Sequence, residues 1–250
     1  MKRLLAIALT SLVMTSTIAS AKDKAPFNLP KGAQVGVVNL LDPELMHYHS
    51  ARKTVDSYVK ITKTTWNVDD MLLTALKAQP VTADLTLTPV SPTDALMRSR
   101  ESCFVNAPLA KGLPKNCAAP LAELATGASV SYLIVMAPGL NNATHADGPR
   151  AETSEMLRGW GLVTHEFAGA KDKPSLFCEV ELLLISVSPE GTTLRAREWG
   201  GSYTYKWQTY TVPADPKTFP PEQLEELQPL FATMLDRHTK DFMEQVHVDP

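Results

Sequence analysis

The chain has 250 residues, enough for one large domain or two small ones. Hydrophobic residues make up 44% and charged residues 20%, which excludes intrinsic disorder as the main state. The net charge of −3 leaves no excess of basic residues, so we expect no nucleic-acid partner.

The first residues resemble a secretory signal peptide. Lys2 and Arg3 precede the apolar run 4–14, and 19–21 (Ala-Ser-Ala) supplies the small residues of a cleavage site. The run is short for a bilayer span, and the alternative is a retained anchor. We therefore expect residues 1–21 to be removed, leaving no transmembrane segment. Without Lys2 and Arg3, 22 basic residues stand against 27 acidic ones, a net charge of −5.

The mature chain, residues 22–250, is expected to form a single domain after a mobile polar lead-in at 22–33. The apolar run Gln34–Leu41 predicts a strand buried on both faces. Residues 55–66 alternate, which predicts a strand with Val59 and Ile61 on one face and Lys60 on a wet face. Further strands are expected at 85–87, 129–136, 161–167, 176–187, 192–199 and 202–212.

Helices are expected between these strands, where apolar residues recur at helical spacing. Asn67 is the predicted N-cap of the first, and residues 91–94 (Ser-Pro-Thr-Asp) predict the start of the second. A third covers 118–126. A final helix begins at 220, where Pro229 is expected to divide or kink it. The order predicts an α/β fold: one mixed sheet with amphipathic helices, an antiparallel hairpin extension and a C-terminal helix.

The cysteines predict one disulfide in an oxidising compartment. Cys103 and Cys117 lie 14 positions apart across a segment rich in Pro, Gly and Asn, and are the natural pair. Three pairings are possible in principle. Cys178 lies within an apolar run and is expected to be a buried free thiol. No C-x-x-C spacing supports a metal site built from cysteines.

Three runs of the sequence carry a resemblance: VGVVNLL at 35–41, SYLIVMAPG at 131–139 and VELLLISVSPEGTTLRAREW at 180–199. Their order and rhythm are similar to periplasmic α/β domains of the TolB amino-terminal and CsgG-like kind, over roughly residues 34–199. The resemblance implies a binding or assembly role in the bacterial envelope. It transfers no catalytic residues.

Motifs for common enzyme classes are missing. There is no G-x-S-x-G elbow, and the S-x-x-K match at 50–53 lacks its companion boxes. Without G-x-x-x-x-G-K or G-x-G-x-x-G loops, no cofactor is expected. Glu179 and Glu181 share one face of a strand, which favours a solvated sheet face over a catalytic carboxylate pair.

A metal site and an aromatic binding strip are the two candidate sites. His47 and His49 are two apart, so on an extended segment both point to the same side and suit a divalent ion. The alternative interpretation is a pair of solvated loop histidines. Further ligands could come from acids and a histidine elsewhere: Asp42, Glu44, His145 and Asp147.

Aromatic residues gather near the end of the hairpin, at Trp199, Tyr203, Tyr205 and Trp207. On a strand, the last three form a flat strip able to stack on sugar rings or on a protein. The alternative is that the strip packs inside the fold.

Together these patterns predict a periplasmic or secreted, non-enzymatic binding or assembly module of the bacterial envelope, whose partner is an envelope protein or a glycan. Two alternatives stay open: a periplasmic hydrolase or metal-binding enzyme, and a glycan-binding protein that uses the aromatic strip.

Overall fold

The computed structural model describes residues 27–50, 57–105, 112–143, 155–165, 174–199, 203–206 and 219–249. The strands are β1 (Phe27–Leu29), β2 (Gln34–Asn39), β3 (Glu44–Ser50), β4 (Tyr58–Lys63), β5 (Thr86–Pro89), β6 (Tyr132–Pro138), β7 (Leu140–Ala143), β8 (Glu155–His165), β9 (Ser175–Ser188), β10 (Gly191–Trp199), β11 (Tyr203–Lys206) and β12 (Val246–Val248). The helices are α1 (Val68–Lys77), α2 (Asp94–Arg100), α3 (Lys115–Gly127) and α4 (Pro221–Met243), with short helical turns η2 (Pro80–Asp84) and η3 (Glu101–Val105). The predicted α/β fold is confirmed.

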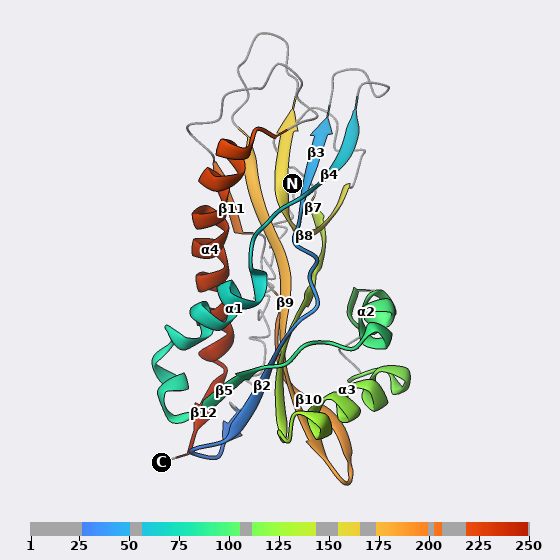
Figure 1. Cartoon of the computed structure of the whole chain (residues 1–250), viewed down its shortest axis with the longest axis vertical. Coiled ribbons are helices and arrows are strands. Elements are labelled where there is room, and N and C mark those ends of the chain that lie inside the picture. Colours follow the sequence, from blue (N-terminus) through green and yellow to red (C-terminus); the bar gives the residue numbers. More distant parts are fainter. Residues whose placement is uncertain are drawn as a thin grey trace, which may run out of the picture.

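The long strand β9 runs through the middle of the described ten-stranded sheet (Figure 1). β6 pairs with its residues 180–186 and β8 with residues 175–179, both antiparallel. On the opposite edge, β10 pairs with residues 181–188 and β11 with residues 175–178. The sheet therefore has a lower half around β6 and β2 and an upper half around β8 and β3, joined by one strand.

In the lower half, β2 lies between β5 and β6 and is parallel to both. Helix α1 precedes β5, and α2 and α3 connect β5 to β6. Since these connections run over opposite faces, both faces of β2 and β6 are covered. The apolar runs predicted to be buried on both sides are confirmed: Val35, Val38, Leu133 and Val135 are completely buried.

Two apolar layers hold the helices to the sheet. On one face, here called the α4 face, α1 and α4 pack against strand residues such as Ile134, Leu182 and Leu184. On the opposite face, α2, η3 and α3 pack against Leu133, Leu183 and neighbours. In Figure 1, α2 and α3 lie beside the lower half of the sheet, whereas α4 extends along the upper half as well.

Helix α4 is continuous from Pro221 to Met243, so the predicted division at Pro229 is wrong. A proline removes one backbone hydrogen bond, but buried residues on either side of it, Leu227 and Phe231, belong to the same core layer. Packing against the sheet thus holds the helix together. The predicted cap at Asn67 is confirmed, because its side chain accepts from the N–H of Asp70 at 3.2 Å.

Four strands were not expected from local pattern: β1, β3, β7 and β12. β3 contains both candidate histidines, and β7 pairs with β8. β1, within the predicted lead-in, pairs in parallel with β12 near the other end of the chain. These pairings join segments far apart in sequence, which local periodicity does not report. Among the described residues, no helix combines the length and hydropathy needed to cross a membrane.

Candidate functional site: the outer edge of β4

Strand β4 ends the described sheet beyond β3, and no described strand bonds to its outer edge. The two strands are antiparallel, with Glu44 opposite Lys63 and His49 opposite Tyr58. The N–H of Thr64 donates to the carbonyl of Pro43 at 2.7 Å, so these two residues are a hydrogen-bonded pair of the two strands. In an antiparallel pair, every second residue directs its N–H and C=O groups toward the neighbouring strand. The N–H and C=O groups of residues 59, 61 and 63 therefore point away from β3.

The burial of the β4 side chains is the reverse of that predicted from the sequence. Val59 and Ile61, expected on the buried face, are 56% and 52% exposed. They lie opposite Tyr48 and Met46 on β3 and continue the apolar face of the upper half. That face also contains Val163 and Phe177, which pack with Tyr48. The exposed pair is thus the rim of an apolar surface at the edge of the sheet.

The charge on β4 has one sign. Lys60 and Lys63 are exposed, and β4 contains no acidic residue. Within the described residues, neither lysine forms an ion pair. Lys63 lies opposite Glu44 on the neighbouring strand, so Lys60 contributes most of the unpaired positive charge.

The opposite end of the sheet, at β5, is closed to strand pairing. The N–H groups of Thr86 and Val90 donate to β2, which turns the nitrogen of Pro89 toward the outer edge. Proline has no N–H to donate, so this edge lacks a donor that β4 possesses. A groove of about 520 Å³ beside β5 is lined by residues of β5 and α3.

The structure brings His47 and His49 together on β3, as the metal hypothesis requires, but not in a solvated loop. His47 is 1% exposed, so the loop interpretation is wrong for it. His47 Nε2 and His49 Nδ1 both lie 2.8 Å from the hydroxyl oxygen of Thr164 on β8. Aromatic rings enclose them: Tyr58 stacks on His49, and Phe219 lies edge-on to His47.

The protonation of this pair follows from its geometry. One hydroxyl has a single proton, so at least one of the two ring nitrogens donates to Thr164. Nδ1 of His47 is buried and has no hydrogen-bond partner among the residues that the structure describes. Burial, and secondarily the neighbouring His49, lowers the pKa of His47 to about 4, so its ring is neutral at pH 7. No three His, Cys, Asp or Glu side chains gather for a metal within the described ranges.

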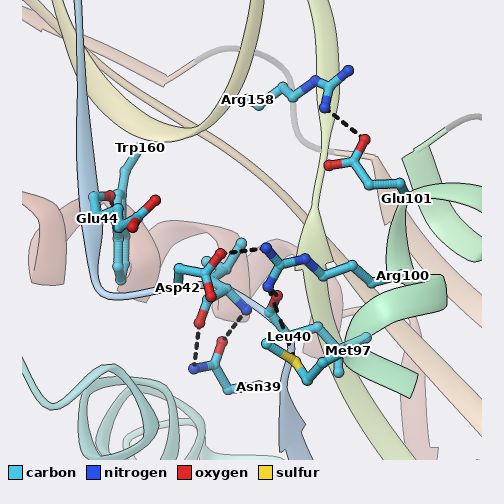
Figure 2. A network of polar contacts seen from close by, with 10 residues as sticks. Asn39, Leu40, Asp42, Glu44, Met97, Arg100, Glu101, Arg158 and Trp160 are labelled. Carbon is cyan, nitrogen blue, oxygen red and sulfur yellow. Dashed lines mark hydrogen bonds and ion pairs between the residues drawn. The ribbon is translucent and has the colours of Figure 1, made fainter. Parts of the chain in front are cut away.

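Of the two acids proposed as extra ligands, Asp42 forms an ion pair with an arginine, and Glu44 lies opposite Lys63 on β4. Figure 2 shows Asp42 beside Arg100 of α2, whose guanidinium also donates to the carbonyl of Leu40 at 3.0 Å. Glu44 accepts from the indole N–H of Trp160 through its backbone carbonyl, at 2.8 Å. These contacts connect α2 and β8 to the β2–β3 segment.

A second ion pair in Figure 2 joins Arg158 of β8 to Glu101 of η3, at 2.6 Å. Arg158 precedes Gly159, whose φ of +62° is a conformation that favours glycine. Both residues of this pair are partly exposed, so its contribution to stability is small. The network as a whole positions α2 and η3 on the sheet.

The carboxylates predicted on a solvated sheet face are buried. Glu179 and Glu181 are 3% and 2% exposed, so that prediction is wrong. Arg197 on β10 donates to both carboxylate oxygens of Glu181, at 2.7 and 3.2 Å. Burial raises the pKa of Glu181, and Arg197 opposes that shift. The paired strand β10 covers a face that β9 alone would leave open.

The cysteines behave as the spacing predicts. The structure joins Cys103 of η3 to Cys117 of α3, with a Cα–Cα distance of 5.6 Å. Cys178 is a free, buried thiol, and burial raises its pKa strongly. His238 of α4 is completely buried and donates from Nε2 to the carbonyl of Cys178 at 2.8 Å.

The aromatic strip is not tested by the structure. Trp199, Tyr203 and Tyr205 lie in β10 and β11, but their side chains fall outside the described part of the chain, as does Trp207 entirely. His145 and Asp147 also fall outside it. Glycan binding therefore stays a prediction. The site that the sequence missed is the β4 edge, whose exposed valine and isoleucine matched an ordinary buried face.

Fold and site define a mixed α/β domain in which the outer edge of β4 carries exposed apolar side chains and has no described strand bonded to it. No family model and no curated protein matches the sequence. Among solved structures, the fold is similar to the hypothetical protein CT253 from Chlamydia trachomatis, at a TM-score of 0.41 and 11% identity. The match covers 86% of this chain and 95% of the other.

Proposed function

We propose that this chain is an exported, non-enzymatic module of the bacterial envelope that binds another protein through the β4 edge. The leader pattern at residues 1–21 supports export, and the cysteine pair suits an oxidising compartment.

One observation carries the binding role. Val59 and Ile61 lie side by side on an edge strand and are more than half exposed. A strand face with alternating apolar residues is usually buried. Positions where the structure departs from such a local sequence pattern are expected at functional sites. Exposed apolar side chains that continue a larger apolar face are typical of surfaces that bind partners.

The test begins in the bacterium that encodes the protein. A photo-crosslinking amino acid at position 61 should form an adduct with one defined partner, whereas the same group at the exposed position Thr88 on β5 should not. The captured partner is then identified and purified. Its affinity for the Val59→Thr/Ile61→Thr variant should be at least about tenfold lower than for wild type, since each buried apolar side chain contributes on the order of 1 kcal/mol.

A matched control exchanges the two side chains. Val59→Ile/Ile61→Val keeps the apolar area and the strand preference and should bind like wild type. Equal affinity of wild type and the double threonine variant for the captured partner would remove the proposal, and so would adducts at position 88 but not at 61.

A further inference from the structure

The β4 edge offers a row of backbone groups as well as apolar side chains. Residues 59, 61 and 63 direct their N–H and C=O groups outward, three donors and three acceptors in a row. An extended segment can bond to such an edge as an additional strand. At β5 the corresponding row is interrupted by Pro89. β4 thus combines an outward row of backbone groups, to which no described strand bonds, with the exposed side chains of Val59 and Ile61.

The charged side chains of β4 indicate which kind of segment binds at this edge. Lys60 and Lys63 are exposed, and β4 has no acid of its own. A second copy of this chain is a poor occupant: antiparallel self-pairing centred on Lys60 opposes two like charges, and centring it on Ile61 places Lys63 against Val59 of the copy. Edge lysines are a known device against self-association. Acidic side chains on the α4 face of an added strand would pair with Lys60, whereas Lys63, on the face of Val59 and Ile61, lies opposite Glu44.

From these contacts we infer that β4 takes up an extended segment of a partner protein in which acidic and apolar residues alternate. The apolar side chains of that segment pack beside Val59 and Ile61, and its acidic side chains on the α4 face lie beside Lys60. This inference rests on the proposed function and adds the chemistry of the partner.

The experiment uses defined peptides with the full mature chain. The first is a capped seven-residue peptide of alternating Glu and Val, kept at concentrations where it is monomeric, and the second replaces Glu by Lys. Binding of the Glu-Val peptide should slow amide hydrogen exchange at Val59, Ile61 and Lys63 by at least tenfold. The Lys-Val peptide should leave these rates unchanged.

Two variants separate backbone pairing from charge. Ile61→Pro removes one outward N–H, as Pro89 does naturally on β5, and should abolish protection by the peptide. Lys60→Glu should weaken the Glu-Val peptide about fivefold or more and make the Lys-Val peptide bind, as expected for a cross-strand charge pair. If the Ile61→Pro variant does not fold, the opposite effects of Lys60→Glu on the two peptides test the inference by themselves.

Three results would overturn the inference: no protection at saturating Glu-Val peptide, equal binding of both peptides, or dimerisation of the free chain that protects the amides of Val59, Ile61 and Lys63. Each is distinct from a failure of the proposed function. If binding of the captured partner depends on Val59 and Ile61 but the Glu-Val peptide does not bind, the proposed function is retained and the inference of an added strand is rejected. If the Glu-Val peptide binds but crosslinking finds no partner, β4 can accept an added strand and the proposed role in the envelope is rejected.

Discussion

At the scale of single residues, burial controls the chemistry of the histidines. His47 and His238 are both inside the protein, and each has one hydrogen bond from its ring to a nearby oxygen. Desolvation lowers the pKa of each ring to about 4, compared with 6.5 for an exposed imidazole. These residues are therefore neutral parts of the core at physiological pH.

The shifted pKa values predict a loss of stability in acid. Between about pH 6.5 and pH 4, the unfolded chain binds protons that the folded chain does not, so the free energy of unfolding falls as pH falls through this window. At pH 5 the loss should be about 2 kcal/mol per histidine. Urea unfolding at pH 7 and pH 5 measures it, and His47→Leu or His238→Leu should reduce the difference by about that amount.

If removing His47 and His238 together left the difference between pH 7 and pH 5 unaltered, the assignment of the acid sensitivity to these rings would be wrong.

At the scale of elements, the layer formed by α2, η3 and α3 depends on a covalent connection. α2 has only seven residues, too short to be stable alone, and the connection from η3 to α3 is long. The disulfide from Cys103 to Cys117 ties these elements together within the apolar cluster that covers the lower half of the sheet. Local helical propensity alone would leave this layer weakly held.

Removing this disulfide should destabilise the protein measurably. Cys103→Ala/Cys117→Ala releases a loop with a sequence separation of 14. Loop entropy predicts a cost of about 3 kcal/mol in the free energy of unfolding, measured by urea titration. Reductant should lower the stability of wild type but have no effect on the double variant, which retains Cys178. Identical unfolding midpoints for wild type and variant would contradict this role.

At the scale of the whole molecule, the two halves of the sheet have different surroundings. The lower half has helices on both faces, whereas the upper half combines α4 on one face with the small apolar cluster of Tyr48, Val163 and Phe177 on the other. The β4 edge lies in the upper half. The proposal is therefore a rigid lower half that supports a binding edge at the other end of β9.

Export is the whole-molecule prediction. Protein recovered from the cell envelope should begin at Lys22, as read by intact mass and N-terminal sequencing, because residues 19–21 form the cleavage site. Replacing Ala19 and Ala21 by Arg should leave residues 1–21 attached. Unprocessed wild-type chain in the cytoplasmic fraction would contradict export.

The sequence by itself determined those features that depend on neighbouring residues. The buried strands β2 and β6 follow from continuous apolar runs, the start of α1 follows from Asn67 as its cap, and the start of α2 follows from residues 91–94. The disulfide follows from cysteine spacing within one connection. In each case the covalent chain brings the relevant groups close together.

Only the tertiary structure decided which faces are covered. The same alternating pattern predicts burial for Val59 and Ile61 and solvent for Glu179 and Glu181, yet the structure reverses both. Arg197 of β10 pairs with Glu181, whereas no described strand bonds to the outer edge of β4. Burial depends on what packs against a strand from distant parts of the chain, and that information is absent from local periodicity.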